Sequence, residues 1–472
     1  MADQLVISLE ESQQFAILSG DTNPLHLDPV VARRTLFQGT VSHGVHVLLA
    51  AIDKWTAQAG PQNVVIADIA AHFLSPVRTG EPFFIAVRQQ GTVVDIHVTT
   101  TSQPALSGVL TLAPAAPSAP DWIGDAAPPC EQPLLLDFPA ATQAVGEVGL
   151  VVDRRTLATL FPNLAKWGDL VAVATLLAAT RIVGVKCPGY FSIFTGLQFK
   201  WDRQTPIVCR FISFAVSQAS QSKSLLRIGI QGDGMKGSLG CIFRPSPVQQ
   251  ISFQLARECV APNQFSKRRC LVIGGSRGLG EIAVKLLAAG DADVRMTYHQ
   301  GEDDAKVICR EITDAGYRLA SFAFDITNPA IKATWANDGW RPSHVYFFAT
   351  PAILPSKDRN WDEEKFTNFC SYFIVGPARI LTWILDNLGV APDDFTICQP
   401  STKFIDEPNV AYSEYSAAKA AAEIALAGLT SRRKIKRLII PRMSRVLTDQ
   451  TNSIIPHRLQ SGVEVLLPML SE

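Results

Sequence analysis

The chain has 472 residues, and at about 100–200 residues per domain this length suggests three domains with sizeable cores. Basic and acidic residues number 43 each, so the chain has no net charge that would favour binding to nucleic acid or to a membrane surface. The nine cysteines show neither C-x-x-C pairs nor metal-ligand spacing, which argues against a disulfide framework or a metal site. The sequence also shows no signal-peptide pattern and no apolar run long enough to span a bilayer. We therefore expect the protein to be cytoplasmic.

The first region is expected to alternate helix and strand around a polar loop. A short helix is predicted around Phe15–Leu18, and a longer buried helix is predicted to start near His43. The runs at 83–90 and 93–100 alternate between apolar and polar residues, which is typical of antiparallel strands. A proline-rich stretch follows and is interpreted as a linker over residues 113–140.

The polar loop, SGDTNPLHLDP, contains a carboxylate and an imidazole five residues apart, Asp21 and His26. Pro24 disfavours a helix between them, so both side chains can converge from one loop. Such a pair suits the addition or removal of water at a C=C bond next to a thioester, because one group handles the hydroxyl and the other the carbon-bound proton. Charge that develops on the thioester oxygen needs a donor, and the expected helix start at Ser42–Gly44 offers free backbone N–H groups.

The surrounding string makes this interpretation more specific. FAILSGDTNPLHLDPVVARRTLFQGTVSHGVHVL, followed by FLSPVRTGEPF at 73–83, resembles the signature of the MaoC-like (R)-specific enoyl-CoA hydratases, which have a hotdog fold. The resemblance implies a hydratase domain over residues 1–112, with Asp21 and His26 as the catalytic pair, Gly44 as the oxyanion donor and Ser42 as a hydroxyl that orients the substrate. The alternative is that Asp21 caps a turn and His26 bonds to the backbone.

Residues 141–245 repeat the order of the first region, with a long apolar helix at Leu170–Val183 and strands at 192–201, 208–216 and 225–232. This region resembles, more weakly, a second and degenerate hotdog unit. No histidine occurs between His97 and His299, so this half cannot supply a second Asp/His pair. The resemblance implies that it helps to build an acyl tunnel and a shared sheet, and we expect a structural role for it.

Three other reactive side chains are expected to be structural. His43 and His46 lie in the first turn and on the apolar face of the predicted helix, where histidines pack or cap more often than they react. Cys187 has no histidine nearby in the sequence that could activate its thiol.

The third region opens with CLVIGGSRGLGEIAVKLLAAG, which changes from a strand run to helical periodicity across a glycine-rich turn. This is the context of a dinucleotide-binding loop, because small residues let the backbone approach the pyrophosphate and the helix N-terminus favours its charge. The expected contacts are Gly274, Gly275, Ser276, Arg277, Gly278, Leu279 and Gly280.

Further along, YSAAK places Tyr415 and Lys419 on one helix face, where the ammonium can lower the pKa of the phenol and bind ribose hydroxyls. Ser401, fourteen residues upstream of Tyr415, can hold a substrate oxygen, and Thr402 is the alternative for that role. Together these motifs resemble the short-chain dehydrogenase/reductase family over about residues 268–450. The resemblance implies that Tyr415 is the general acid/base, that Lys419 tunes it and that Ser401 is its partner.

The expected cofactor is NADP(H). Arg277 lies in the glycine loop, and no acid is present at 297–299 to bind a ribose 2′-hydroxyl. Asp325 resembles the adenine contact of the family.

Three positions depart from the family pattern. Phe347–Thr350 reads FFAT where the family has N-N-A-G, and Pro441-Arg442 replaces the late P-G pair. Tyr372 or Phe373 stands where an asparagine completes the proton relay. These departures make a nucleotide-binding scaffold without turnover the alternative to an atypical reductase.

The sequence therefore predicts an α+β double hotdog, with its second half at 141–245, followed by an α/β Rossmann domain at 268–472 with a doubly wound parallel sheet. The expected function is bifunctional, combining hydration or dehydration of an enoyl/3-hydroxyacyl thioester with NADP-linked interconversion of the 3-hydroxyacyl and 3-oxoacyl forms. The thioester handle is expected to be coenzyme A or an acyl-carrier protein. NADP favours synthesis of fatty acids or polyketides, and breakdown is the alternative direction. We expect a homo-oligomer with neither nucleic-acid nor membrane partners.

Overall fold

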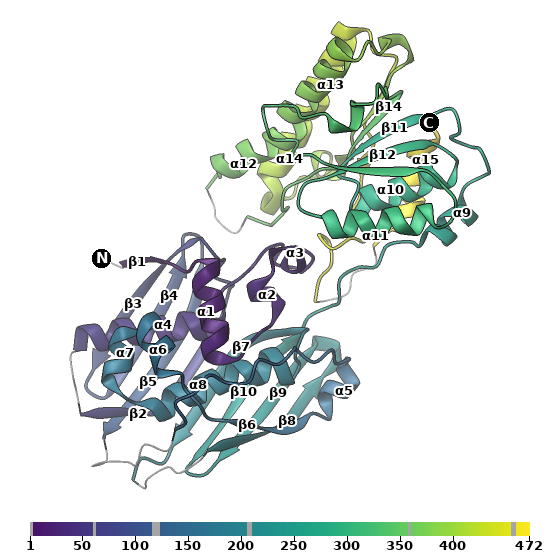
Figure 1. The fold of residues 1–472 in the computed structure, drawn as a ribbon. Helices are drawn as coiled ribbons and strands as arrows, with labels where there is room; N and C mark the ends of the chain where they lie inside the picture. Colours follow the sequence, from purple (N-terminus) through teal and green to yellow (C-terminus); the bar gives the residue numbers. More distant parts are fainter. Residues whose placement is uncertain (1–2, 60–62, 116–122, 205–209, 357–359, 455–458) are drawn as a thin grey trace. The chain divides into compact units, whose positions relative to one another are not determined.

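The computed structural model describes residues 3–59, 63–115, 123–204, 210–356, 360–454 and 459–472 (Figure 1). The chain forms two compact units. Unit 1 extends to Ser246 and also includes residues 453–454, and unit 2 comprises Pro247–Asn452 together with residues 459–472. None of the described helices is long and apolar enough to cross a membrane.

Unit 1 is built on one ten-stranded antiparallel sheet. Its strands lie in the order β1 (Asp3–Val6), β3 (Pro82–Gln90), β4 (Val93–Thr100), β5 (Pro104–Pro114), β2 (Val64–Phe73), β7 (Ser192–Trp201), β10 (Met235–Phe243), β9 (Leu225–Gly232), β8 (Phe211–Ser220) and β6 (Val145–Gly149). Read outward from the β2–β7 junction, each half has the same order of strands. The predicted duplication of a helix-and-sheet unit is therefore confirmed.

A long helix in each half packs on this sheet. They are α4 (Gly44–Ala59) and α8 (Leu170–Arg181) (Figure 1). Their buried residues belong to one hydrophobic core that spans both halves. A π-helical turn, η1 (Ile182–Lys186), continues α8. The other helices are α1 (Leu9–Ser19), α2 (Pro24–Leu27), α3 (Pro29–Ala32), α5 (Phe138–Thr142), α6 (Arg154–Leu160) and α7 (Pro162–Trp167).

Local signals explain how the chain reaches the polar loop. Helix α1 ends at Gly20, whose φ of 74° is in the left-handed region that glycine adopts without steric cost. Pro24 was expected to keep the loop free of helix, and this expectation was wrong. It occupies the first position of the one-turn helix α2, where its missing N–H would have had no partner, and the side chain of Asn23 caps that helix.

Unit 2 contains a six-stranded parallel sheet. Its strands lie in the order β13 (Leu319–Ala323), β12 (Asp293–Tyr298), β11 (Arg269–Ile273), β14 (His344–Phe347), β15 (Thr396–Cys398) and β17 (Arg437–Ile439). The chain builds outward first on one side of β11 and then on the other. This is the doubly wound order, with its switch point between β11 and β14, so the predicted Rossmann fold is confirmed.

Helices cover both faces of this sheet, as the side chains of β11 show. Cys270 and Val272 belong to a core with α10 and α11, whereas Leu271 and Ile273 belong to a core with α13. The helices are α9 (Phe253–Cys259), α10 (Gly278–Ala289), α11 (Glu302–Thr313), α12 (Glu363–Cys370), α13 (Gly376–Asn387), α14 (Ser413–Arg433) and α15 (Gly462–Ser471). A π-helical turn, η4 (Ser371–Val375), joins α12 to α13, and β16 (Ser401–Thr402) pairs with β18 (Arg442–Met443).

Candidate active sites

The carboxylate of Asp21 lies against the second half of unit 1. The residue is 2% exposed, and its Oδ2 accepts a hydrogen bond of 2.6 Å from the hydroxyl of Thr180 on α8. A Cβ atom at Gly184 of η1 would lie 2.0 Å from Asp21 Oδ1, so only glycine leaves room for the carboxylate. The second half was expected to have a structural role, but Thr180 and Gly184 of this half contact the predicted catalytic acid and shape its surroundings.

Asn23 ties the same loop to the second half. Its Nδ2 lies 3.1–3.3 Å from the carbonyl oxygens of Gly184, Gly189 and Tyr190. Its backbone N–H donates to Asp21 Oδ1 at 3.2 Å. One amide side chain therefore fixes the loop that carries Asp21.

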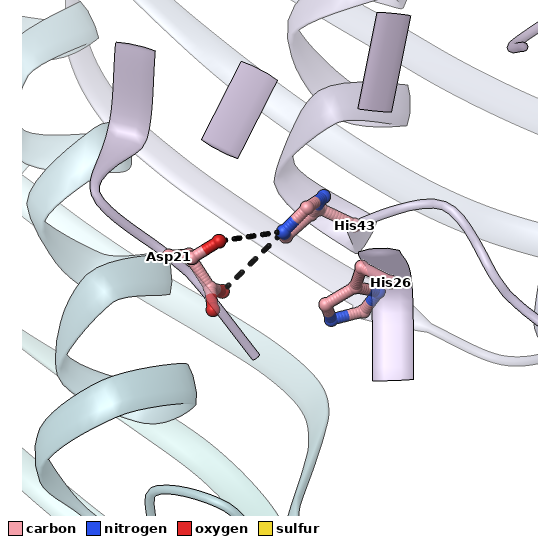
Figure 2. Close-up of side chains that lie close together, drawn as sticks. All are labelled: Asp21, His26 and His43. Atoms are coloured by element: carbon pink, nitrogen blue, oxygen red, sulfur yellow. Dashed lines mark hydrogen bonds and ion pairs between the residues drawn. The ribbon is translucent and has the colours of Figure 1, made fainter. Parts of the chain in front are cut away.

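His26 is oriented by its own backbone neighbourhood. Its Nδ1 lies 2.7 Å from the carbonyl oxygen of Val41, which can only accept, so Nδ1 carries the proton and Nε2 keeps a lone pair. The ring stacks on that of His43, with centroids 3.8 Å apart. The Nε2 of His43 donates to the carbonyl oxygen of Asp21 at 3.1 Å and lies 4.0 Å from Asp21 Oδ2 (Figure 2). Sequence reasoning missed His43 as a site residue, although it directly precedes Gly44.

Burial dominates the electrostatics of this cluster. It raises the pKa of Asp21, against the opposing effects of His26 and of the hydrogen bond from Thr180. It lowers the pKa of His26, although the carboxylate of Asp21 acts in the other direction. It also lowers the pKa of His43 well below the usual range and that of His46 to about 3. The imidazoles are therefore held neutral, and the carboxyl group can retain a proton above the usual pH range.

The ligand atoms of Asp21, His26 and His43 lie within 4.8 Å of one another, a spacing that would also suit a metal ion. The two imidazole rings stack face to face, however, so their nitrogen lone pairs do not converge on one point. His43 Nε2 is also engaged with a carbonyl oxygen. The geometry is that of an acid–base site.

A cavity of about 220 Å³ opens beside the pair. Its polar wall includes Asp21, His26, Ser42 and Gly44, and the rest is mainly apolar. Gly44 is the first residue of α4, so its N–H has no partner within the helix, and a Cβ there would lie 2.8 Å from the ring of Phe73. The hydroxyl of Ser42 is buried with no hydrogen-bond partner among the described residues. The four predicted residues thus line one mainly apolar cavity.

The glycine-rich loop of unit 2 follows β11 at the switch point of the sheet. Gly274 has a φ of 83°, and a Cβ atom there would lie 2.6 Å from the backbone nitrogen of Ala349. A Cβ atom at Gly280 would lie 2.1 Å from the carbonyl oxygen of Gly274. Thr297 holds the loop to β12, accepting from Gly274 N at 3.1 Å through its hydroxyl and from Gly275 N at 2.9 Å through its carbonyl.

Ser276 and Arg277 lie in the loop, and helix α10 begins at Gly278, so Leu279 lies in its first turn. Its first-turn N–H groups lack partners within the helix, and with the glycine backbone they fit a pyrophosphate. Asp325 follows β13, next to β12 in the sheet. Its carboxylate accepts two hydrogen bonds from Thr327. Burial alone would raise the pKa of Asp325, but these hydrogen bonds and the nearby His299 lower it below its usual value.

Ser401 and Thr402 are neighbours on β16 and therefore point to opposite sides. Ser401 donates to Glu423 Oε1 at 2.5 Å, whereas the hydroxyl of Thr402 is hydrogen-bonded to Tyr415. Burial raises the pKa of Tyr415 to about 12, and the bond with Thr402 opposes this rise. The structure therefore does not bring Ser401 to Tyr415, and the alternative, Thr402, takes that place.

Lys419 faces an aromatic ring where a relay amide was expected. Its Nζ donates to the carbonyl oxygen of Pro400 at 2.8 Å and lies 3.8 Å from the ring centroid of Phe373 and 6.0 Å from that of Tyr415. Burial lowers the pKa of Lys419 to about 7, partly opposed by Glu423. Of the two residues considered for the relay position, Phe373 is the one that contacts both Lys419 and Tyr415.

The chain therefore combines two kinds of unit. The first is an antiparallel, hotdog-like unit with an acid–base cluster, and the second is a Rossmann unit with a glycine-rich loop. Residues 2–115 match the family model described as a MaoC like domain. The N-terminal part of the chain is therefore similar to a MaoC-like domain.

Individual relatives are distant. A "Probable oxidoreductase" from Streptomyces antibioticus is 28% identical over 207 residues, covering 39% of this chain and 68% of the relative. Similar solved structures include an alternative dihydrofolate reductase 1, FolM, from Brucella canis complexed with NADP (16% identity, 37% of this chain, 72% of that chain, TM-score 0.34). They also include a mutant short-chain dehydrogenase/reductase from Serratia marcescens (16% identity, 44% of this chain, 90% of that chain, TM-score 0.39). A third is acetoin dehydrogenase from Enterobacter cloacae (19% identity, 43% of this chain, 87% of that chain, TM-score 0.36).

Proposed function

We propose that unit 1 hydrates 2-enoyl thioesters and dehydrates 3-hydroxyacyl thioesters. The observation that carries this proposal is that Asp21 and His26 line one mainly apolar cavity together with Gly44, whose N–H has no partner within α4. The apolar wall suits an acyl chain, and the N–H of Gly44 suits the thioester oxygen. The thioester handle is coenzyme A or an acyl-carrier protein.

The arrangement of protons assigns a role to each member of the pair. With Nδ1 bound to Val41, Nε2 of His26 accepts a proton from water as the hydroxyl adds to the β-carbon. Asp21, whose pKa is raised by burial, supplies the proton for the α-carbon. The proton on His26 then returns to Asp21 and restores the pair, and dehydration is the reverse sequence.

Thr180→Val tests the contribution of the second half. The change keeps the shape of the side chain but removes the hydroxyl that donates to Asp21, so the pKa of Asp21 should rise further and kcat for hydration should fall by about tenfold, the size of one hydrogen bond to a charged group. The measurement is the hydration rate of a short trans-2-enoyl-CoA. Thr175→Val is the matched control, because that hydroxyl bonds to the carbonyl of Val171 in its own helix. An equal loss in both variants would contradict the assigned role of Thr180.

For unit 2, we propose an NADP-linked oxidoreductase acting on the same 3-hydroxyacyl thioester and its 3-oxo form. Bound NADPH would supply the hydride. Tyr415 donates the proton to the substrate oxygen, Thr402 orients that oxygen, and Lys419 stabilises the ionised phenol and the ribose hydroxyls. Arg277 and the lack of an acid at 297–299 favour NADP over NAD.

Gly280→Ala should weaken NADPH binding by about tenfold or more, because the added Cβ would meet the carbonyl oxygen of Gly274 and push the loop out of place. Fluorescence titration with NADPH measures the effect. Gly428→Ala is the control, since a Cβ there has only one atom within 4 Å and the residue lies inside α14, where alanine favours the helix. If Gly280→Ala binds NADPH as tightly as the wild-type protein, the glycine-rich loop is not the binding site for the pyrophosphate.

The two activities share one intermediate, and their fusion raises its concentration at the second site. NADP favours reduction followed by dehydration, as in the synthesis of fatty acids or polyketides. The contact of Phe373 with Lys419 favours a second candidate, a unit 2 that binds nucleotide without turnover. We also propose that the chain forms a homo-oligomer.

A further inference from the structure

A buried arginine without an ion-pair partner lies beside the proposed hydratase site. Arg244 follows β10 and is 1% exposed. Among the described residues, no carboxylate pairs with it, and its Nε and Nη1 have no hydrogen-bond partner. Burial lowers its pKa to about 10, partly opposed by Tyr190, so the group stays charged at neutral pH. An uncompensated buried charge is costly, and the neighbours of Arg244 indicate why it is kept.

Arg244 holds the turn at 189–192 from one side. Its Nη2 donates to the carbonyl oxygen of Tyr190 at 2.6 Å, and its backbone N–H donates to that of Phe191 at 2.8 Å. Its guanidinium lies 5.2 Å and 5.5 Å from the ring centroids of Tyr190 and Phe191. These contacts fix the turn and its carbonyl groups.

Asn23 contacts the same turn. Its Nδ2 lies 3.3 Å from the Tyr190 carbonyl oxygen that Arg244 also binds. Its Oδ1 accepts from Leu25 N, and its backbone N–H donates to Asp21 Oδ1. The position of the catalytic loop therefore depends on a carbonyl group that Arg244 holds in place.

The charge of Arg244 also reaches His26. The titratable groups that act on His26 or on which it acts are Asp21 in its own loop, His43 directly before α4, His46 on α4, and Arg244. The carboxylate of Asp21 favours the protonated imidazole, whereas the positive charge of Arg244 opposes it. Arg244 thereby opposes the effect of Asp21, which favours protonation of His26 at Nε2.

We propose that Arg244 is a positioning residue of the hydratase site, which fixes the Asp21–His26 loop through the Tyr190 carbonyl and Asn23. This inference rests on the hydratase function proposed for unit 1. Arg244 lies 218 positions after His26 in the chain (244 minus 26), and no sequence motif marks it.

Two variants separate position from charge. Arg244→Met removes the charge and the hydrogen bond, so it should lower kcat for a short trans-2-enoyl-CoA by about tenfold and move the acidic limb of the pH profile to higher pH, since His26 binds a proton more readily. Arg244→Lys keeps the charge but not the planar fork, so it should lower kcat with the acidic limb near its wild-type position. If Arg244→Met does not fold, Arg244→Gln serves in its place.

Arg181→Met is the matched control. Arg181 is also a buried arginine of the second half, and it binds the carbonyl of Gly149, but no effect of its charge on His26 is found. Its replacement should leave the acidic limb in place even if it lowers the Tm.

An NMR titration of the His26 imidazole, assigned with His26→Gln, gives a readout independent of activity. Its midpoint should rise in Arg244→Met and stay near wild type in Arg181→Met. An unchanged kcat in a folded Arg244→Met would overturn the inference. Absence of hydration by the wild-type protein would instead reject the proposed function, and the NMR titration would still decide whether Arg244 acts on His26.

Discussion

Asp21→Asn should lower kcat for hydration of a short trans-2-enoyl-CoA by about a thousandfold, with KM changed by less than about threefold. The amide has nearly the same shape. Its oxygen can still accept from the backbone N–H of Asn23 and its NH2 group can donate to the hydroxyl oxygen of Thr180, so the loop should keep its position. It cannot supply a proton to the α-carbon. The loss should therefore fall on the chemical step, and the rate at saturating substrate measures it.

Asp28→Asn is the control for this experiment. Asp28 belongs to the same loop, but its carboxylate caps α3 through Val30 N and Val31 N, and asparagine caps helices equally well. We expect nearly wild-type kcat and a nearly unchanged Tm. Substantial activity in Asp21→Asn would reject the assigned acid, and an equal loss in Asp28→Asn would assign the effect to the fold of the loop.

Tyr415→Phe should reduce NADPH oxidation with a 3-oxoacyl-CoA by about a thousandfold and leave NADPH binding nearly unchanged. The ring still packs against Phe369 and Phe373, but no hydroxyl remains to protonate the substrate oxygen. Loss of NADPH absorbance measures turnover, and fluorescence titration measures binding. Unaltered turnover would mean that another group donates the proton.

The neighbouring hydroxyls give a sharper comparison. Thr402→Ala should lower turnover and Thr402→Ser should largely restore it, because serine keeps the hydroxyl that bonds to Tyr415. Ser401→Ala should have a small effect, because Ser401 bonds to Glu423. The opposite order of losses would return Ser401 to the role that the family resemblance implied.

Patterns within single elements were predictable from the sequence. The strands at 192–201 and 225–232 begin and end where alternation predicts, because each strand buries one face. The convergence of Asp21 and His26 was also predicted, since five residues and a proline restrict how far apart they can lie. The start of α4 at Gly44 followed from the apolar run behind it.

Contacts between distant segments were not predictable. Thr180 and Gly184 reach Asp21 across more than 150 positions, and their helix reads only as an apolar core segment. Periodicity reports which face is buried, not which side chain it meets. Ser401 and Thr402 show the same limit at short range, because two adjacent hydroxyls on a two-residue strand give no pattern that says which one faces Tyr415.

The most direct test of the account adds a short trans-2-enoyl-CoA to the purified protein, follows the absorbance of the conjugated thioester, and then adds NADP⁺. We expect loss of that absorbance, followed by formation of NADPH, and no loss with Asp21→Asn. Together these results would establish hydration at the Asp21–His26 site and its coupling to unit 2 through one 3-hydroxyacyl intermediate. Persistent absorbance with the wild-type protein, or an equal rate with Asp21→Asn, would contradict the central claim that this pair adds water to an enoyl thioester.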